Sequence, residues 1–129
     1  MMIISTIAGK RKSKITPMKI YHNPRCSKSR QTLELLKEKG VDPEVVLYLD
    51  TPPSESELKR VLKLLGMNAV DLLRKNESIY KEQFKGQDHS DDEWIRIMVA
   101  NPKLIERPIV VHKKRATIGR PPENVLSIL

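Results

Sequence analysis

Residues 19–40 predict a strand, a loop and a helix in direct succession, and this order restricts the fold more than any other stretch of the chain. Lys19–Tyr21 is a short strand-forming segment, and a loop that contains a proline follows it. We expect a helix over residues 27–40, because Leu33 and Leu36 are spaced to share one face and a glycine suits the helix end. The segment therefore predicts one β-α unit.

The apolar run Glu44–Asp50 predicts the second strand. The run is nearly continuous, so we expect both faces of this strand to be covered. A second amphipathic helix follows, with Ser54 and Glu57 as a capping box and Gly66 at its end. Two strands joined through a helix predict a right-handed parallel crossover.

Residues 67–105 predict a helical insert. Ala69–Lys75 is interpreted as a short helix, and a second capping box, Ser90 with Glu93, opens a longer one. The Asn101-Pro102 pair ends that helix.

The apolar pattern then changes to that of strands. Ile109–Val111 and Ala116–Ile118 predict a hairpin through a turn at His112–Arg115. A last helix is expected to start at residues 120–123, because proline is well suited to a first helical turn. The residues expected to pack this helix onto the sheet are Val125, Leu126 and Leu129.

The complete order is β-α-β-α, a helical insert, and β-β-α. It predicts an α/β protein with a thioredoxin-like fold, a mixed sheet and helices on both faces. We expect a single domain over residues 18–129. Met1–Pro17 shows no helical or strand period, and its charges follow its short apolar run instead of preceding it, so we expect a disordered leader and no secretory signal.

Cys26 is the only cysteine of the chain. It lies at the start of the first predicted helix, where free backbone N–H groups and the helix dipole favour an anion. We expect the side chains of Arg25, Lys28 and Arg30, and His22 when protonated, to lower the pKa of the thiol further. A buried structural cysteine would stand in an apolar run, whereas polar and charged residues surround this one. The sequence therefore predicts a reactive thiolate.

A single cysteine excludes an intramolecular disulfide and favours a reducing compartment, so we expect a cytoplasmic protein. Any redox cycle at Cys26 must then take its second thiol from another molecule. No apolar run approaches the ~20 residues that span a bilayer, so we expect no membrane association. The net charge is +8, but the basic residues are spread along the chain and aromatic residues make up only 4%, so we expect no nucleic-acid binding.

Three arginines stand apart from the charged helix faces. Arg74 follows an apolar pair, Arg107 precedes Pro108, and Arg120 precedes Pro121. An X-Pro bond costs only about 0.5–1 kcal/mol to become cis, so the bond between Arg107 and Pro108 is a candidate cis bond. A thiolate that attacks a tetrahedral oxyanion brings like charges together, and several guanidinium groups would offset this repulsion.

Several common sites are excluded. The chain has neither a GxxxxGK[ST] phosphate loop nor a GxGxxG motif. Position 32 is threonine, which excludes a CX5R phosphatase loop, and Ser29 stands where a dithiol CxxC motif has its second cysteine. The three histidines are scattered, and one cysteine is too few for a structural zinc site, so we expect no metal.

Five blocks of the sequence resemble, in the same order, the glutaredoxin-coupled arsenate reductases of the ArsC family and its short YfgD-type branch. These blocks are YHNPRCSKSRQTL, VVLYLDTPP, LLRKN, ERPIVV and GRPPENVL. The resemblance covers residues 18–129 and implies a thioredoxin-like fold with a helical insert. It implies that Cys26 is the nucleophile, that His22 stabilises the thiolate, and that Ser29 is the family's serine three residues after the cysteine.

The resemblance also implies an anion site. The family's oxyanion-binding arginines fall on Arg74, Arg107 and Arg120, Arg30 completes its HX3CX3R motif, and its cis proline falls on Pro108. The implied reaction is attack of the thiolate on arsenate, with glutathione as co-substrate and glutaredoxin as the partner that regenerates the thiol. We expect a monomer without a bound cofactor.

Two alternatives to an arsenate reductase remain open. Spx-type regulators share the fold and contact RNA polymerase, but they usually carry CxxC where this chain has CSKS. A glutathione-dependent thiol oxidoreductase with another substrate would use the same site. The presence of all three anion-binding arginines favours the arsenate reductase.

Overall fold

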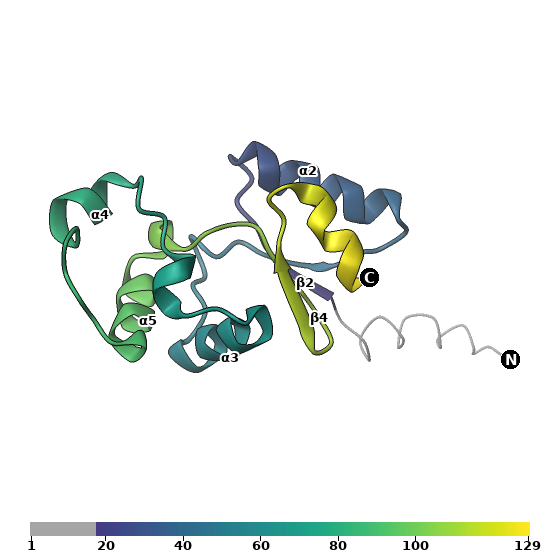
Figure 1. Ribbon diagram of the computed structural model, residues 1–129. Helices are drawn as coiled ribbons and strands as arrows, with labels where there is room; N and C mark the ends of the chain where they lie inside the picture. Colours follow the sequence, from purple (N-terminus) through teal and green to yellow (C-terminus); the bar gives the residue numbers. More distant parts are fainter. Residues whose placement is uncertain (1–17) are drawn as a thin grey trace, which may run out of the picture.

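The computed structural model describes residues 18–129 (Figure 1), so the expected leader lies outside the described residues. A four-stranded sheet has the order β3-β2-β4-β5. Its strands are β2 (Met18–Tyr21), β3 (Glu44–Val46), β4 (Ile109–His112) and β5 (Arg115–Ile118). β2 is parallel to β3 and antiparallel to β4, and β4 and β5 form the predicted hairpin. The predicted α/β, thioredoxin-like architecture with a mixed sheet is confirmed.

Helices cover both faces of the sheet. On one face lie α2 (Ser27–Glu38) and the 3-10 helix η3 (Pro122–Ile128), and on the other lies α3 (Glu55–Leu65) (Figure 1). The insert contains η1 (Ala69–Leu72), α4 (Ser78–Gln83), α5 (Asp91–Ala100) and η2 (Pro102–Leu104). It packs against α3 through α5.

Alternate residues of the two central strands face two separate cores. Ile20 and Val110 pack with Leu36 of α2 and with apolar residues of η3. Tyr21 and Ile109 point to the opposite face, toward α3 and the insert. All five side chains are nearly completely buried, so the strand ends that lead to the loops are held from both sides.

The capping residues of the two long downstream helices agree with the sequence in part. Ser90 and Glu93 form a complete capping box at the start of α5. At the start of α3, the Ser54 hydroxyl accepts the backbone N–H of Glu57 at 3.1 Å. The Glu57 carboxylate does not return to the cap but accepts the hydroxyl of Tyr21. The second half of the predicted box is therefore replaced by a bond between α3 and the sheet.

The second strand is shorter and more exposed than its apolar run predicts. β3 ends at Val46 and forms an edge of the sheet. Val45 and Leu47 are 42% and 41% exposed, so the expectation of a strand covered on both faces is wrong. An apolar run indicates strand propensity but does not distinguish an edge strand from a central one. Tyr48, two residues after β3, is only 1% exposed.

The last helix has a different period from the one predicted. It is a 3-10 helix, and its three residues per turn place Pro122, Val125 and Ile128 on the buried face. Leu126 and Leu129, which were expected to pack against the sheet, are 41% and 42% exposed. Of the three expected packing residues, only Val125 is buried.

The predicted short helix Ala69–Lys75 is helical only in its first half. η1 ends at Leu72, and Leu73 forms an isolated antiparallel bridge with Ile105. The backbone N–H of Arg74 then donates to the last carbonyl of η2 at 2.8 Å. Arg74 is therefore fixed on an extended segment by the chain that returns toward β4.

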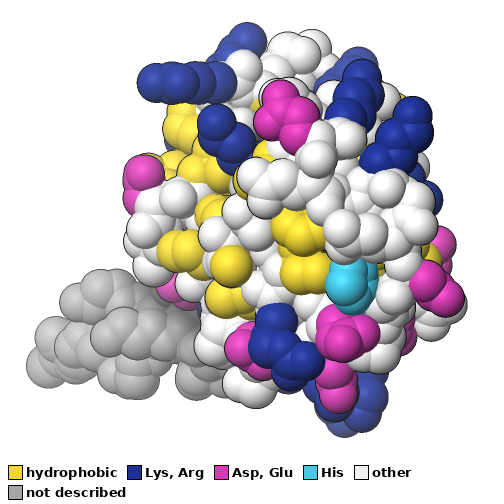
Figure 2. All heavy atoms as spheres, turned by 90° about the vertical axis from the view of Figure 1, so that its left-hand side faces the viewer, with side chains coloured by type: hydrophobic (Ala, Val, Ile, Leu, Met, Phe, Trp, Pro, Cys, Tyr) yellow, Lys and Arg dark blue, Asp and Glu magenta, His cyan; other side chains and the backbone are white. Residues whose placement is uncertain are grey.

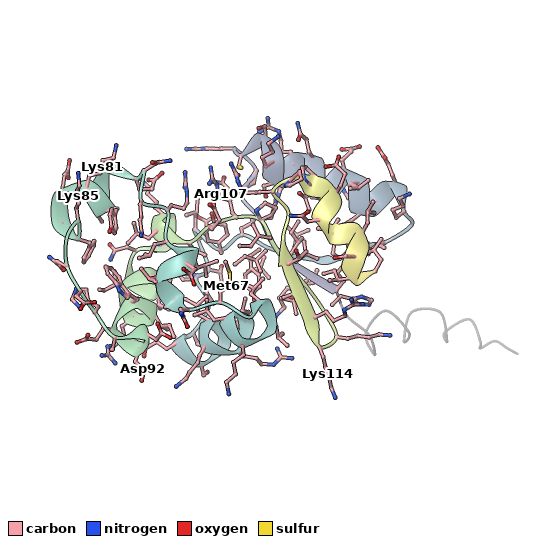
Figure 3. All side chains as sticks on the ribbon, viewed as in Figure 1. Met67, Lys81, Lys85, Asp92, Arg107 and Lys114 are labelled. Atoms are coloured by element: carbon pink, nitrogen blue, oxygen red, sulfur yellow. The ribbon has the colours of Figure 1, made fainter. Side chains whose placement is uncertain are left out.

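The face formed by the insert mixes charged and apolar side chains (Figure 2). In this view α4 and α5 lie toward the reader, and Lys and Arg side chains gather mainly along the upper part, with acidic and apolar side chains below. Figure 3 places Arg107 toward the upper end of the molecule and Lys114, in the hairpin turn, at the lower end. No helix within residues 18–129 is both long enough and apolar enough to cross a membrane.

The register of η3 predicts that Ile128 contributes more to the free energy of unfolding than Leu126, two residues before it. Replacing Ile128 by Ala should lower the free energy of unfolding by about 2–4 kcal/mol, because it leaves a cavity in the core beneath α2. The matched change Leu126→Ala should cost less than about 1 kcal/mol, because that side chain is exposed. Urea denaturation of both variants measures this, and equal losses would contradict the 3-10 register.

Candidate active site

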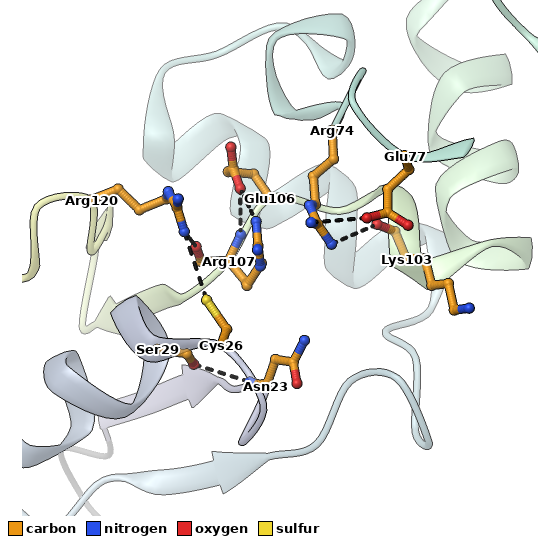
Figure 4. Close-up of polar contacts among 9 residues, drawn as sticks. All are labelled: Asn23, Cys26, Ser29, Arg74, Glu77, Lys103, Glu106, Arg107 and Arg120. Carbon is orange, nitrogen blue, oxygen red and sulfur yellow. Dashed lines mark hydrogen bonds and ion pairs between the residues drawn. The ribbon is translucent and has the colours of Figure 1, made fainter. Parts of the chain in front are cut away.

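The candidate site lies where the carboxyl ends of two parallel strands meet. The backbone N–H of His22, directly after β2, donates to the carbonyl of Val46 at the end of β3, at 2.8 Å. The loop that follows leads to Cys26, which occupies the N-cap position of α2. The sulfur faces Arg107 and Arg120, which come from the loops before β4 and after β5 (Figure 4).

Ser29 holds the loop in place. Its hydroxyl oxygen lies 2.6 Å from Nδ1 of His22 and accepts the backbone N–H of Asn23 at 3.0 Å. Its side chain is fully buried in the first turn of α2. The backbone N–H of Cys26 donates to the Asn23 carbonyl at 3.0 Å, which closes the turn. The start of the loop is thus tied to the helix start, and the position of the sulfur follows.

The surroundings of His22 disfavour the charged form of its imidazole. Burial lowers its pKa, and the nearby charges of Arg30 and Lys37 lower it further. A neutral imidazole can accept the Ser29 hydroxyl at Nδ1, so the short bond between them is a contact of uncharged groups. Burial thus opposes the protonated form of His22 that was expected to assist the thiolate, and His22 contacts Ser29, whose backbone N–H favours the thiolate of Cys26.

The pKa of the Cys26 thiol lies below its usual value. Burial raises this pKa, but the backbone N–H of Ser29, the Arg107 guanidinium, the backbone N–H of Lys28 and the Arg120 guanidinium together outweigh burial. The helix start contributes as the sequence predicts. The cations differ from those expected, because the charges that act on the sulfur come from arginines distant in sequence and not from its immediate neighbours.

Arg120 and Arg107 form the wall opposite the sulfur (Figure 4). Nη1 of Arg120 lies 3.7 Å from Sγ of Cys26 and donates to the Arg107 carbonyl at 3.4 Å. Nη1 of Arg107 pairs with Oε1 of Glu106 at 2.9 Å. Nε of Arg107 is buried and has no hydrogen-bond partner within residues 18–129.

Arg74 approaches the same space from the insert (Figure 4). Its Nη2 pairs with Oε2 of Glu77 at 2.9 Å, and its Nη1 donates to the Lys103 carbonyl at 3.3 Å. Arg30, the fourth predicted arginine, is not part of this group. It is exposed and donates to the Pro24 carbonyl at 2.9 Å. The structure therefore places three of the four arginines around one space, whereas the fourth, Arg30, lies in α2 and reaches back to the loop.

The two arginines of the wall are followed by cis prolines. The bond Arg107–Pro108 is cis, as predicted, and Arg120–Pro121 is cis as well, which the sequence analysis did not predict. Gly119 lies directly before Arg120, and a Cβ atom there would meet Oγ1 of Thr32 at 2.5 Å and Cγ of Pro108 at 3.0 Å. Only glycine allows this close approach of the loop to α2.

Thr32 and Gly119 were missed as site-supporting residues. Thr32 is fully buried on α2, although threonine is usually exposed in a helix of this kind. Its position six residues after Cys26 and the glycine before an arginine at a strand end are the two signals that could have indicated them. Neither signal predicts that Thr32 and Gly119 contact each other, because the two residues are distant in sequence and meet only in the folded chain.

These features define a class of protein: a thioredoxin-like protein in which a cysteine with a lowered thiol pKa lies beside a group of arginines. Within residues 18–129, no group of three or more His, Cys, Asp or Glu residues is arranged to hold a metal ion. A thiolate faced by guanidinium groups can attack the central atom of a tetrahedral oxyanion while the arginines hold its oxygens.

The chain belongs to the ArsC family, which it matches over residues 21–128. It is 58% identical to the Escherichia coli protein YfgD, over 87% of this chain and 96% of that protein. It is 46% identical to an arsenate reductase of Neisseria meningitidis, over 87% of this chain and 97% of that protein. An arsenate reductase structure from Vibrio cholerae superimposes with a TM-score of 0.84 at 52% identity, over 88% and 98% of the two chains. The resemblance seen in the sequence is confirmed.

The electrostatics of the site predict which arginines set the reactivity of Cys26. In Arg107→Ala, the inflection of the alkylation rate against pH should move upward, because a charge that favours the thiolate is lost. In Arg25→Ala the inflection should stay in place, although Arg25 adjoins Cys26 in sequence, because its side chain is exposed. Iodoacetamide labelling between pH 5 and 10, followed by mass spectrometry, measures both. A shift in Arg25→Ala alone would contradict the assignment.

Proposed function

We propose that this protein is an arsenate reductase in which Cys26 is the nucleophile and Arg74, Arg107 and Arg120 hold the oxyanion. The observation that carries the proposal is the approach of Arg120 to 3.7 Å from the Cys26 sulfur, beside a buried Nε of Arg107 that has no hydrogen-bond partner among residues 18–129. A nucleophile and hydrogen-bond donors for its anionic substrate share one site. Relatives that cover nearly this whole chain bear the name arsenate reductase.

In the first step, the Cys26 thiolate attacks arsenic(V) of arsenate. A sulfur–arsenic bond forms, one arsenic–oxygen bond breaks, and hydroxide leaves. Both reactants are anions, so their approach would be repelled in the absence of the guanidinium groups. Arg107 and Arg120 offset this repulsion and donate to the oxygens, on which negative charge is concentrated in the transition state.

In the second step, a glutathione thiol attacks the sulfur of Cys26. A mixed disulfide forms, the sulfur–arsenic bond breaks, and its electron pair stays on arsenic, which leaves as arsenite. Two thiols are oxidised to one disulfide while arsenic gains two electrons. Glutaredoxin then takes the glutathione group by thiol–disulfide exchange and returns the Cys26 thiolate. The single cysteine of the chain supports this scheme, because both other thiols come from outside.

We assign positioning roles to three residues, one in the loop before α2 and two in the first turn of α2. Ser29 and His22 hold the turn before α2, and thereby fix the sulfur relative to the backbone N–H groups that favour the thiolate. Arg30 braces the loop at the Pro24 carbonyl. The protein is proposed to work in the cytoplasm as a monomer, without a bound cofactor or metal.

Coupled turnover tests the proposal. Arsenate-dependent NADPH oxidation is measured with glutathione, glutaredoxin and glutathione reductase. Cys26→Ser should abolish turnover, because the nucleophile is lost. Arg107→Ala should lower kcat/KM for arsenate by about 10²–10³-fold, the usual effect of removing one donor from an oxyanion site. Arg25→Ala is the matched control, and it should retain activity because its side chain is exposed.

The outcomes separate the alternatives. Turnover that persists in Cys26→Ser would overturn the proposal. An inactive wild type whose Cys26 still alkylates rapidly near neutral pH would indicate another thiol substrate on the same site. Co-purification with RNA polymerase that is indifferent to Arg74, Arg107 and Arg120 would favour a regulator.

A further inference from the structure

Two buried side-chain atoms stand out because they lack hydrogen-bond partners. Within residues 18–129, the buried side-chain nitrogen and oxygen atoms without a partner are the hydroxyl of Tyr48 and Nε of Arg107. Buried polar groups are nearly always paired, and an unpaired one is costly. Nε of Arg107 belongs to the anion site, so its free donor has an explanation there. The Tyr48 hydroxyl would have the same explanation if it also faced a bound anion.

The fold brings Tyr48 to the edge of the sheet that carries the site. Tyr48 follows β3 by two residues, just as the loop of Cys26 follows β2, and the two strands are parallel. Its side chain packs in the core with Ile105 and Ile109 and lines a small cavity with them. These two residues stand two positions before and two positions after Arg107. The tyrosine ring therefore lies against the segment that carries Arg107.

The charges that reach the phenol are those of the site. Burial raises the pKa of Tyr48 to about 12, against the lowering effect of Arg107 and then Arg74. Cys26 and Glu106 act in the opposite direction. The hydroxyl therefore stays protonated at neutral pH and can serve as a neutral donor, within range of the charges that act at the site.

We propose that the Tyr48 hydroxyl donates a hydrogen bond to an oxygen of the tetrahedral oxyanion bound between Cys26 and the arginines, and so is a substrate-binding residue. The inference rests on the proposed function. The guanidinium groups supply charge and several donors, whereas a fixed phenol adds one donor at a set position without attracting a further counter-ion. Such a donor orients the anion relative to the sulfur.

Tyr48→Phe is a sharp test because the hydroxyl has no hydrogen-bond partner in the described part of the chain. The substitution removes one oxygen and leaves the ring in the core, so the melting temperature should stay the same or rise. The KM for arsenate should increase about tenfold or more, since a hydrogen bond to a charged group is lost. Arsenate binding is also measured by calorimetry in the Cys26→Ser variant, with and without Tyr48→Phe. The Kd for arsenate should rise by the same factor as the KM.

Tyr21→Phe is the matched control. Tyr21 is also buried, with 4% exposure against 1% for Tyr48, but its hydroxyl donates to Glu57 on α3. Its removal should lower the melting temperature by a few degrees, because a partnered bond is lost, and should leave the KM for arsenate unchanged. The two tyrosines are thus expected to show opposite patterns in stability and substrate binding.

The results distinguish this inference from the proposed function. If the wild type reduces arsenate and Tyr48→Phe leaves the KM for arsenate unchanged, the role of Tyr48 is overturned and the proposed function stands. A fall in melting temperature like that of Tyr21→Phe would overturn it as well, because the hydroxyl would then have a structural role. If the wild type does not reduce arsenate, the proposed function fails. Arsenate affinity in the Cys26→Ser background would still decide the role of Tyr48, and equal Kd values would overturn it.

Discussion

The attraction between the Cys26 sulfur and the guanidinium groups opposite it is the interaction on which the site depends. It joins the first loop of the fold to the two loops that flank the C-terminal hairpin. Burial alone would raise the pKa of the thiol and leave it inert, and the charges of Arg107 and Arg120 with two backbone N–H groups reverse that effect. The proposed function uses the same guanidinium groups to hold the oxygens of the anion.

The three arginines of the site have different partners in the protein. Arg107 and Arg74 are each paired with a glutamate, Glu106 and Glu77, which limits the positive charge and fixes each side chain. Arg120 instead contacts the sulfur and the Arg107 carbonyl. An incoming anion would therefore meet a preorganised wall and would compete mainly with Cys26 for Arg120. Such preorganisation lowers the cost of arranging donors during the reaction.

Much of the fold and the position of the candidate nucleophile could be predicted from the sequence, because they depend on local signals. Short apolar segments, capping residues and a cysteine at a helix start specify the β-α unit and the position of Cys26. Three features were not predictable in this way. The exposure of β3 depends on its place at the sheet edge, the register of η3 depends on a 3-10 period, and the cations beside Cys26 are distant in sequence.

A direct measurement of the bond between sulfur and arsenic tests the central claim that Cys26 is a nucleophile toward a bound oxyanion. The protein is mixed with arsenate in the absence of glutathione, and arsenic X-ray absorption reports the atoms bound to arsenic. We predict a sulfur neighbour in the wild-type protein and only oxygen neighbours in Cys26→Ser. Oxygen neighbours alone in a wild-type protein that still reduces arsenate would contradict the claim, because the reduction would then proceed without the adduct.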